Sequence, residues 1–131
     1  MSTDVALFAG LLLALQIKHL FADFFLQTAY MIENRRVYGH PGGLIHVAIH
    51  VLGSAVVFAM ISTVDGPMWG ISLILIAEAL VHYHIDWAKD RIVIRYALTP
   101  KDRNYWIATG TDQALHHLTY VAMALAWWSM L

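Results

Sequence analysis

The sequence contains four long apolar stretches, and each carries two potential metal-ligating residues spaced four positions apart. The pairs are His19 and Asp23, His46 and His50, His82 and Asp86, and Asp112 and His116. On an α-helix, residues four apart lie about 40° apart around the axis and ~6 Å apart along it, so both side chains leave from one face. The spacing predicts four helices that each present two donors, and one polar site where the four faces meet.

Composition favours a membrane over water as the environment. Of the 131 residues, 60% are hydrophobic and only 13% are charged, which is too apolar for a soluble domain of this size. Stretches at about 5–28, 43–63, 68–92 and 111–131 each reach the ~20 residues that span hydrocarbon. We expect an all-α fold in a single domain, 1–131: a four-helix transmembrane bundle with a short amphipathic inner-face segment before the last helix. A soluble bundle with unusually apolar helices is the alternative.

Several classes of site and partner are excluded by the residues that are missing. The chain has no cysteine, which rules out disulfides, thiolate zinc sites, iron–sulfur clusters and covalently attached haem. The first apolar run is preceded by Asp4 and by no basic residue, so a cleaved signal peptide is not expected. The net charge is −1, and no basic stripe with interleaved aromatic residues indicates nucleic acid as a partner.

Basic residues are confined almost entirely to two of the connections between the apolar stretches. Seven of the eight Lys and Arg residues stand there: Arg35, Arg36, Lys89, Arg91, Arg95, Lys101 and Arg103. By the positive-inside rule, both connections face the cytoplasm, and both termini lie outside. The segments 39–43 and 65–67, which are rich in Gly and Pro, support the boundaries of the second and third stretches.

This orientation places all four ligand pairs at one depth. The first and third pairs lie late in stretches that run inward, whereas the second and fourth lie early in stretches that run outward. The pairs therefore share a layer near the cytoplasmic face that is roughly one to two helical turns thick. Since neither the histidines nor the aspartates were used to set the orientation, this convergence is an independent indication of a common site.

Carboxylates inside a membrane need compensation. Each charged side chain in hydrocarbon costs on the order of 3 kcal/mol, and Asp23, Asp86 and Asp112 are all placed there. One or two divalent cations would neutralise them, with the five imidazoles filling further coordination positions. Imidazole and carboxylate ligands make zinc the first expectation, followed by manganese or iron. A single metal with a surrounding polar shell fits the same residues.

Three further polar residues are expected around the ligands: Gln27, Glu78 and Gln113. Gln27 continues the first ligand face. Glu78 lies one turn before the third face and could be a ligand, a proton carrier or the partner of Lys18, and the ion pair is favoured. Gln113 points about 100° away from Asp112, so contact with a neighbouring helix is an equal alternative.

Other ionisable residues are expected to lie away from the site. His84 and His117 project about 200° and 100° from the adjacent predicted ligands. Asp90 is expected at the membrane interface in contact with solvent. Arg35 and Arg36 are predicted to anchor the topology, and the alternative is that they draw anionic lipid head groups toward the site.

The order of these residues resembles a bacterial membrane family known as domain of unknown function 3307. The shared pattern runs His19-x3-Asp23-x3-Gln27, then Met31, His46-x3-His50, His82-x3-Asp86-Trp87 and Asp112-Gln113-x2-His116. The resemblance covers essentially the whole chain, and it implies a multi-pass protein of the bacterial inner membrane with its site at these residues. It implies no reaction. A looser similarity, by analogy alone, is to small membrane proteins described as metal-dependent hydrolases.

The leading hypothesis for function is a membrane-embedded, metal-dependent hydrolase. A bound metal lowers the pKa of a coordinated water toward neutrality and polarises a phosphoryl or acyl oxygen. Asp23 or Asp86, if not a ligand, would act as the general base. A site near the inner face suits a substrate whose head group lies at the inner leaflet, such as a phospholipid or an isoprenoid phosphate.

The sequence also leaves alternative functions open. Opposed His and Asp pairs are similar to the intramembrane sites of zinc exporters, so the chain could transport or sense a divalent cation, although four short helices would need a homo-oligomer for alternating access. Haem ligation by His50 and His116 is disfavoured by the carboxylates beside them. The chain could also be a structural or accessory subunit of a larger membrane complex, whose polar layer only joins helices.

Overall fold

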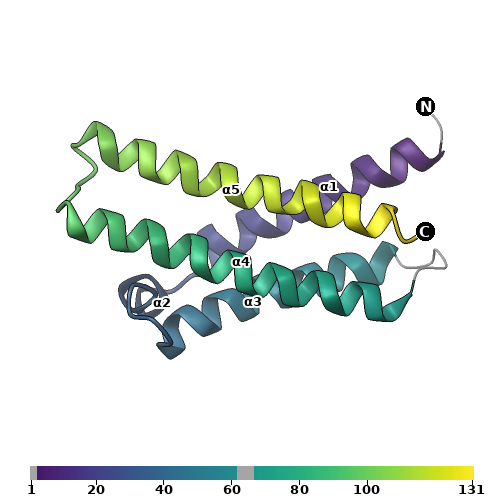
Figure 1. Ribbon diagram of the computed structural model, residues 1–131, viewed down its shortest axis with the longest axis horizontal. Coiled ribbons are helices and arrows are strands. Elements are labelled where there is room, and N and C mark those ends of the chain that lie inside the picture. Colours follow the sequence, from purple (N-terminus) through teal and green to yellow (C-terminus); the bar gives the residue numbers. More distant parts are fainter. Residues whose placement is uncertain (1–2, 62–66) are drawn as a thin grey trace.

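The computed structural model describes residues 3–61 and 67–131, and every regular element in them is helical. The elements are α1 (Thr3–Phe21), η1 (Ala22–Leu26), α2 (Ala29–Asn34), α3 (Pro41–Ile61), α4 (Met68–Arg95) and α5 (Arg103–Trp128). Figure 1 shows α1, α3, α4 and α5 running along the length of the molecule, with α2 at one end. The predicted all-α fold is confirmed for these residues.

The four long helices enclose a common interior. α1 and α4 each pack against α3 and α5, and α2 packs against α3. One half of the interior is apolar and is filled by Leu11, Leu15, Val57, Phe58, Ile71, Ile74, Tyr120, Met123, Ala124 and Trp127. These residues come from the parts of the helices remote from α2. The half of the interior nearer α2 is left for polar side chains.

The first predicted helix, 5–28, is divided in the structure. α1 passes into a turn of π-helix, η1, and Gln27 is extended, with φ −71° and ψ 122°. Thr28 then caps α2, because its side chain accepts a hydrogen bond from the Met31 N–H. Single π-helical turns occur frequently at functional sites, and this one contains Asp23.

α2 folds back closely on the start of α3. The predicted break in this region is confirmed at Gly39, whose φ of +76° favours glycine. α3 begins at Pro41, slightly before the predicted start, and proline suits a first helical position because that N–H has no partner in the helix. A Cβ at Gly43 would lie 3.3 Å from the Arg35 Cα. This close approach holds Arg35 near Asp86 and Asp90 of α4.

The short segment predicted before the last helix does not form a separate element. In the preceding turn, the Asp102 carboxylate accepts hydrogen bonds from the Thr99 N–H (2.7 Å) and hydroxyl (2.8 Å), which lower the pKa of Asp102. α5 then runs unbroken from Arg103 rather than from about 111, because the segment between them contains no proline that would end a helix. α4 likewise continues to Arg95, beyond the predicted 92.

Within residues 3–61 and 67–131, three helical segments are long and apolar enough to cross a membrane: Thr3–Leu26, Pro41–Ile61 and Met68–Arg95. The predicted fourth span, in α5, is not among them, because polar residues such as Asp112 and His116 lower its mean hydropathy. The end of the second predicted stretch at 63, and the turn at 65–66, lie outside the described residues.

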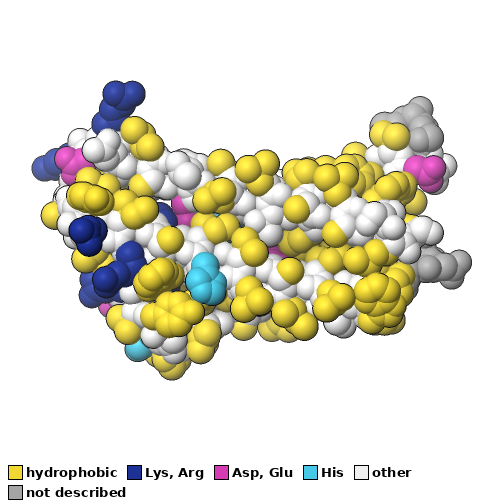
Figure 2. Space-filling model, in the orientation of Figure 1, with side chains coloured by type: hydrophobic (Ala, Val, Ile, Leu, Met, Phe, Trp, Pro, Cys, Tyr) yellow, Lys and Arg dark blue, Asp and Glu magenta, His cyan; other side chains and the backbone are white. Residues whose placement is uncertain are grey.

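Large apolar side chains cover the outside of the bundle (Figure 2); Leu52 and Met60, for example, are 66% and 76% exposed. Such a surface suits lipid rather than water.

The two ends of the bundle differ in charge. Figure 2 shows Lys and Arg side chains gathered at the end that carries α2 and the connection between α4 and α5. The beginning of α1 and the end of α5 lie at the opposite end (Figure 1). The molecule therefore has one basic end, and the polar half of its interior lies toward that end.

Candidate metal centre

The polar half of the interior contains the eight predicted ligands. They come from the four long helices and η1: His19, Asp23, His46, His50, His82, Asp86, Asp112 and His116. The five imidazoles are at most 3% exposed. Because each pair is spaced by about one helical turn, both members of a pair point into the bundle together. Their common location matches the predicted convergence, and their role as ligands stays a prediction.

Three imidazoles surround the Asp23 carboxylate. Oδ1 lies 3.0 Å from His50 Nε2 and 3.5 Å from His46 Nε2. Oδ2 lies 3.2 Å from His19 Nε2. The three rings belong to α1 and α3, and each presents the same ring nitrogen to the carboxylate. Asp23 is thus the centre of a first group of nitrogen and oxygen donors.

A second group surrounds the Asp86 carboxylate. Oδ2 lies 3.1 Å from His46 Nε2 and 3.4 Å from His82 Nε2, and Oδ1 lies 3.3 Å from His116 Nε2. His46 therefore faces both Asp86 and Asp23, and it joins the two groups. Five Nε2 atoms converge on two carboxylates in the middle of the bundle.

The opposite ring nitrogens of three of these histidines have polar partners farther out. The Tyr120 hydroxyl lies 2.9 Å from His19 Nδ1 and 3.5 Å from His50 Nδ1. The Gln27 amide nitrogen lies 3.2 Å from His46 Nδ1. Metal-ligating imidazoles characteristically hold their second nitrogen in this way, because the outer partner fixes the ring orientation and the tautomer.

Donor spacing and unpaired oxygens show that these residues fit a cation. In each of three triplets the donor atoms lie within 4.8 Å of one another: His19, Asp23 and His50; His46, His50 and His82; and His82, Asp86 and His116. Asp86 Oδ2 and Asp112 Oδ1 are buried without a hydrogen-bond partner, although Asp86 Oδ2 is 3.1 Å from His46 Nε2. These two oxygens thus lie close to imidazole nitrogens without forming hydrogen bonds to them. Unpaired buried carboxylate oxygens are costly, and a cation between these groups would satisfy them. The buried His and Asp residues could therefore hold a metal ion.

Residues 11–131 match the family model described as "Protein of unknown function (DUF3307)". The chain belongs to the DUF3307 family. The matched range contains all eight residues of the donor cluster, and the resemblance expected from the residue pattern is confirmed. Comparisons with curated proteins and with solved structures gave no significant match. DUF3307 membership itself assigns no reaction, so function has to be argued from the geometry of the site.

Arg35 reaches the DUF3307 donor cluster from the end of α2. Its Nε lies 2.7 Å from Asp90 Oδ2, and its Nη1 lies 3.8 Å from Asp86 Oδ1. Burial lowers the pKa of Arg35, but Asp86 and Asp90 more than offset this effect, so the pKa is raised above its usual value. Asp90 is therefore not the solvated residue that was predicted, because its side chain is 13% exposed and also binds Lys89 at 3.2 Å.

A buried ion pair lies on the apolar side of the imidazoles. Lys18 Nζ is 2.6 Å from Glu78 Oε1, which confirms the favoured pairing of these residues. Ser54 also donates to Glu78 Oε1 (2.8 Å), and Lys18 donates to the His50 carbonyl (3.0 Å). The network joins α1, α3 and α4 directly behind His50. Glu78 is fully buried. Its partners are Lys18 and Ser54 rather than the histidines of the two donor groups.

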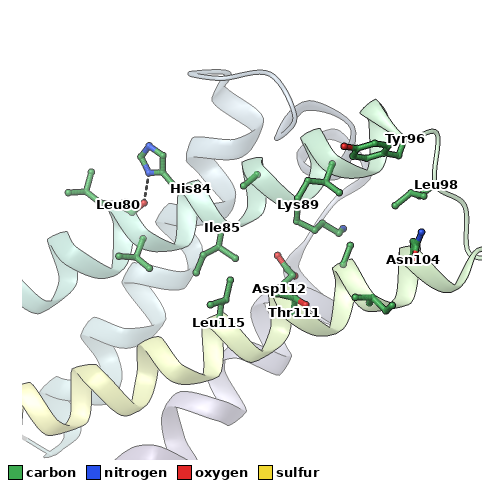
Figure 3. Close-up of a pocket in the computed structure, with 15 residues that line it drawn as sticks. Leu80, His84, Ile85, Lys89, Tyr96, Leu98, Asn104, Thr111, Asp112 and Leu115 are labelled. Atoms are coloured by element: carbon green, nitrogen blue, oxygen red, sulfur yellow. Dashed lines mark hydrogen bonds between the residues drawn. The ribbon is translucent and has the colours of Figure 1, made fainter.

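Among the polar residues left open by the sequence, Gln113 reaches the cluster. Its Oε1 lies 3.2 Å from His19 Nε2, and its amide nitrogen lies 3.5 Å from Asp23 Oδ2. His84 stays outside, as expected: it is exposed, and its Nδ1 lies 2.7 Å from the Leu80 carbonyl oxygen. Figure 3 shows the contact between the His84 ring and the Leu80 carbonyl on α4. His117 is exposed and contacts Gln16, but its ring also packs edge-on against the His19 ring, with the ring centroids 5.7 Å apart.

Sequence reasoning missed two residues of the site. Tyr120 stands four positions after His116 and eight after Asp112, so extending the α5 ligand face by one turn would have found it. Arg35 carries no such signal, because its place over Asp86 depends on how α2 folds back on α3.

Proposed function

We propose that this DUF3307 protein is a multi-pass metalloprotein of the bacterial inner membrane, with α1, α3, α4 and α5 all crossing the bilayer. The basic end faces the cytoplasm and both termini face outward, in keeping with the charge difference between the ends. α5 is the least apolar of the four, but Asp112 and His116, which lower its hydropathy, are buried in the bundle. A helix whose polar residues point inward still presents an apolar face to lipid.

The convergence of five Nε2 atoms on two carboxylates is the observation that carries the proposal. Imidazole and carboxylate donors favour zinc, with manganese or iron as further candidates. Two carboxylate-centred groups joined by His46 suit two ions, whereas the overlapping triplets would also serve one ion. The charge of the cation offsets the carboxylates that would otherwise be isolated in hydrocarbon.

The reaction best supported is hydrolysis of a phosphate ester on a membrane lipid. A divalent cation held by these imidazoles and carboxylates would activate a water at neutral pH and would polarise the phosphoryl oxygen. Water adds to phosphorus, the bond between phosphorus and the lipid oxygen breaks, and the lipid leaves as its alcohol after taking up a proton. The site has the donors for such a metal and the acidic groups for the proton transfer.

The general base is better assigned to Asp112 than to Asp23 or Asp86. Each of the latter two carboxylates is surrounded by three Nε2 atoms, which suits a ligand. Asp112 Oδ1 has no hydrogen-bond partner and lies 3.7 Å from His116 Nε2. An unpaired carboxylate oxygen at the edge of the cluster is free to accept a proton from water.

The two alternative functions are less well supported. Transport of a cation would require a path from the cluster to the other end of the bundle, but the interior there is packed with apolar side chains such as Leu15, Phe58 and Trp127. If the chain had a purely structural role in a complex, its polar helix faces would be expected to point outward to a partner. Here the donors are directed into the bundle, and at least one unpaired oxygen remains on each of Asp86 and Asp112.

The test is to purify the protein in detergent, measure bound metals by elemental analysis, and assay release of phosphate from a lipid phosphate. Bound zinc, manganese or iron that is lost in His50→Ala and His116→Ala but kept in His84→Ala supports the centre. Hydrolysis that is lost in Asp112→Asn with the metal retained supports the assigned base. Protein without a transition metal would refute the centre, and metal-loaded protein that moves cations across proteoliposomes without hydrolysis would favour transport.

A further inference from the structure

A long groove runs between α4 and α5. It has a volume of about 1040 Å³, and its walls are mainly apolar side chains such as Leu80, Ile85 and Leu115. Figure 3 shows Ile85 and Leu115 on the facing sides of the two helices, with Lys89 and Asp112 reaching into the space between them. The groove thus combines a hydrocarbon-like wall with one charged region.

The groove continues along the same helix pair toward the apolar half of the bundle. A second cavity of about 550 Å³ shares Val81, Ile85 and Leu115 with the first and extends to Ile74. From Ile85 to Ile74, which both line this space, α4 rises about 16 Å. Half of a bilayer's hydrocarbon core is about 15 Å thick. The apolar part of the groove is therefore as long as the chain region of one leaflet.

The charged region of the groove borders the donor cluster. Asp112 lines the groove and also lies 3.7 Å from His116 Nε2. Lys89 lines it as well; its ammonium group binds Asp90 and has three donors, so others remain for a ligand. The bundle end beyond carries further basic side chains (Figure 2). An anionic head group is the complement of this charge distribution.

We propose that this groove binds the substrate lipid, with a hydrocarbon chain between α4 and α5 and a phosphate-bearing head group at Lys89 and Asp112. The inference rests on the proposed hydrolase function and specifies its substrate: a phosphate lipid that enters sideways from the inner leaflet. An ammonium group and a neighbouring metal centre recognise the phosphate, and the apolar walls recognise the chain. A soluble phosphate ester would use the metal centre without the groove.

Direct labelling of the groove tests the inference without relying on hydrolysis. The protein in nanodiscs is irradiated with phosphatidic acid that carries a photoactivatable group in its chain, and the labelled residues are mapped by mass spectrometry. We expect labels concentrated on Leu80, Ile85 and Leu115. Ala108→Trp places a large ring in the groove and should reduce labelling several-fold, whereas Ala114→Trp, on an exposed part of α5 outside the groove, should not.

Lys89→Gln is the second variant, and Arg91→Gln on the same helix is its control. Lys89→Gln should reduce labelling by phosphatidic acid several-fold without changing labelling by a diacylglycerol probe with the same chain, and Arg91→Gln should change neither. Labels spread evenly over all lipid-facing helices, or unchanged by Ala108→Trp, would overturn the inference. Groove labelling without any lipid hydrolysis would refute only the proposed function. Hydrolysis of a soluble ester without groove labelling would refute only the groove.

Discussion

The Tyr120 hydroxyl lies 2.9 Å from His19 Nδ1, on the side of the ring opposite to the nitrogen that faces Asp23. The same hydroxyl lies 3.5 Å from His50 Nδ1. One phenol therefore stands behind two imidazoles of the same donor group. Tyr120 is 1% exposed, so no solvent competes for these contacts. It can orient both rings toward Asp23 without being a ligand itself.

Tyr120→Phe should weaken metal binding while preserving the fold. Loss of an outer partner of a ligating histidine typically reduces metal affinity by about 10–100-fold, and phenylalanine keeps the buried ring. Competition with a metal-binding dye measures the affinity. Tyr96→Phe, on an exposed tyrosine, is the control. Equal affinities for Tyr120→Phe and the unmodified protein would show that the hydroxyl does not orient the ligands.

His82→Ala and His84→Ala should behave differently, although the residues are two positions apart. His82 belongs to two of the three donor triplets, so its removal should abolish most of the bound metal. His84 is exposed and outside the cluster, so its removal should leave the metal content unchanged. Elemental analysis of both purified variants provides the comparison. Similar metal loss in both would indicate binding at surface histidines.

Metal binding should weaken as the pH falls. Imidazole binds a cation only in its neutral form, so protons and metal compete for the same Nε2 atoms, and metal is released on the acid side. Equilibrium dialysis over a pH series, followed by elemental analysis, measures this release. A metal content that is constant down to strongly acidic pH would argue against histidine ligation.

Breaking the ion pair between Lys18 and Glu78 should destabilise the bundle. Both side chains are at least nine-tenths buried, and removal of one partner of a buried pair costs about 3–5 kcal/mol, because the other charge is left uncompensated. Lys18→Met or Glu78→Leu should therefore lower the thermal unfolding temperature in detergent. The double variant should lose much less than the sum of the two. Strictly additive losses would show that the residues do not act as a pair.

The orientation of the bundle can be tested by cysteine labelling, because the chain contains no cysteine. Thr3→Cys and Ser129→Cys lie at one end of the molecule, and Lys101→Cys lies at the other. A membrane-impermeant thiol reagent added to intact cells should label the first two and leave the third unlabelled until the cells are opened. The reverse pattern would invert the proposed topology, and labelling of Thr3→Cys alone would contradict a fourth span, because Lys101 and Ser129 would then lie on the same side.

The sequence predicted those parts of the fold that depend on local periodicity. Donor pairs one helical turn apart mark the inward face of each long helix, and Lys18 and Glu78 could be paired from their similar depth. These inferences succeeded because a helix converts sequence spacing directly into direction and height.

Other features depend on contacts that spacing does not encode. The helix from Thr3 was expected to continue to 28, but it ends in a π-turn and an extended Gln27, and α2 follows. Arg35 reaches Asp86 because α2 folds back over Gly43. α5 begins at Arg103 because the turn held by the Thr99 and Asp102 hydrogen bonds directly precedes it. Each outcome follows from packing or capping between elements rather than from the pattern within one element.

All the donors of the three triplets, and the hydroxyl and amide groups behind them, come from a single polypeptide. One copy of the chain thus carries all the residues of the proposed metal centre. If several copies assemble in the membrane, each would add its own centre, and the number of ions would rise in proportion to the number of protomers.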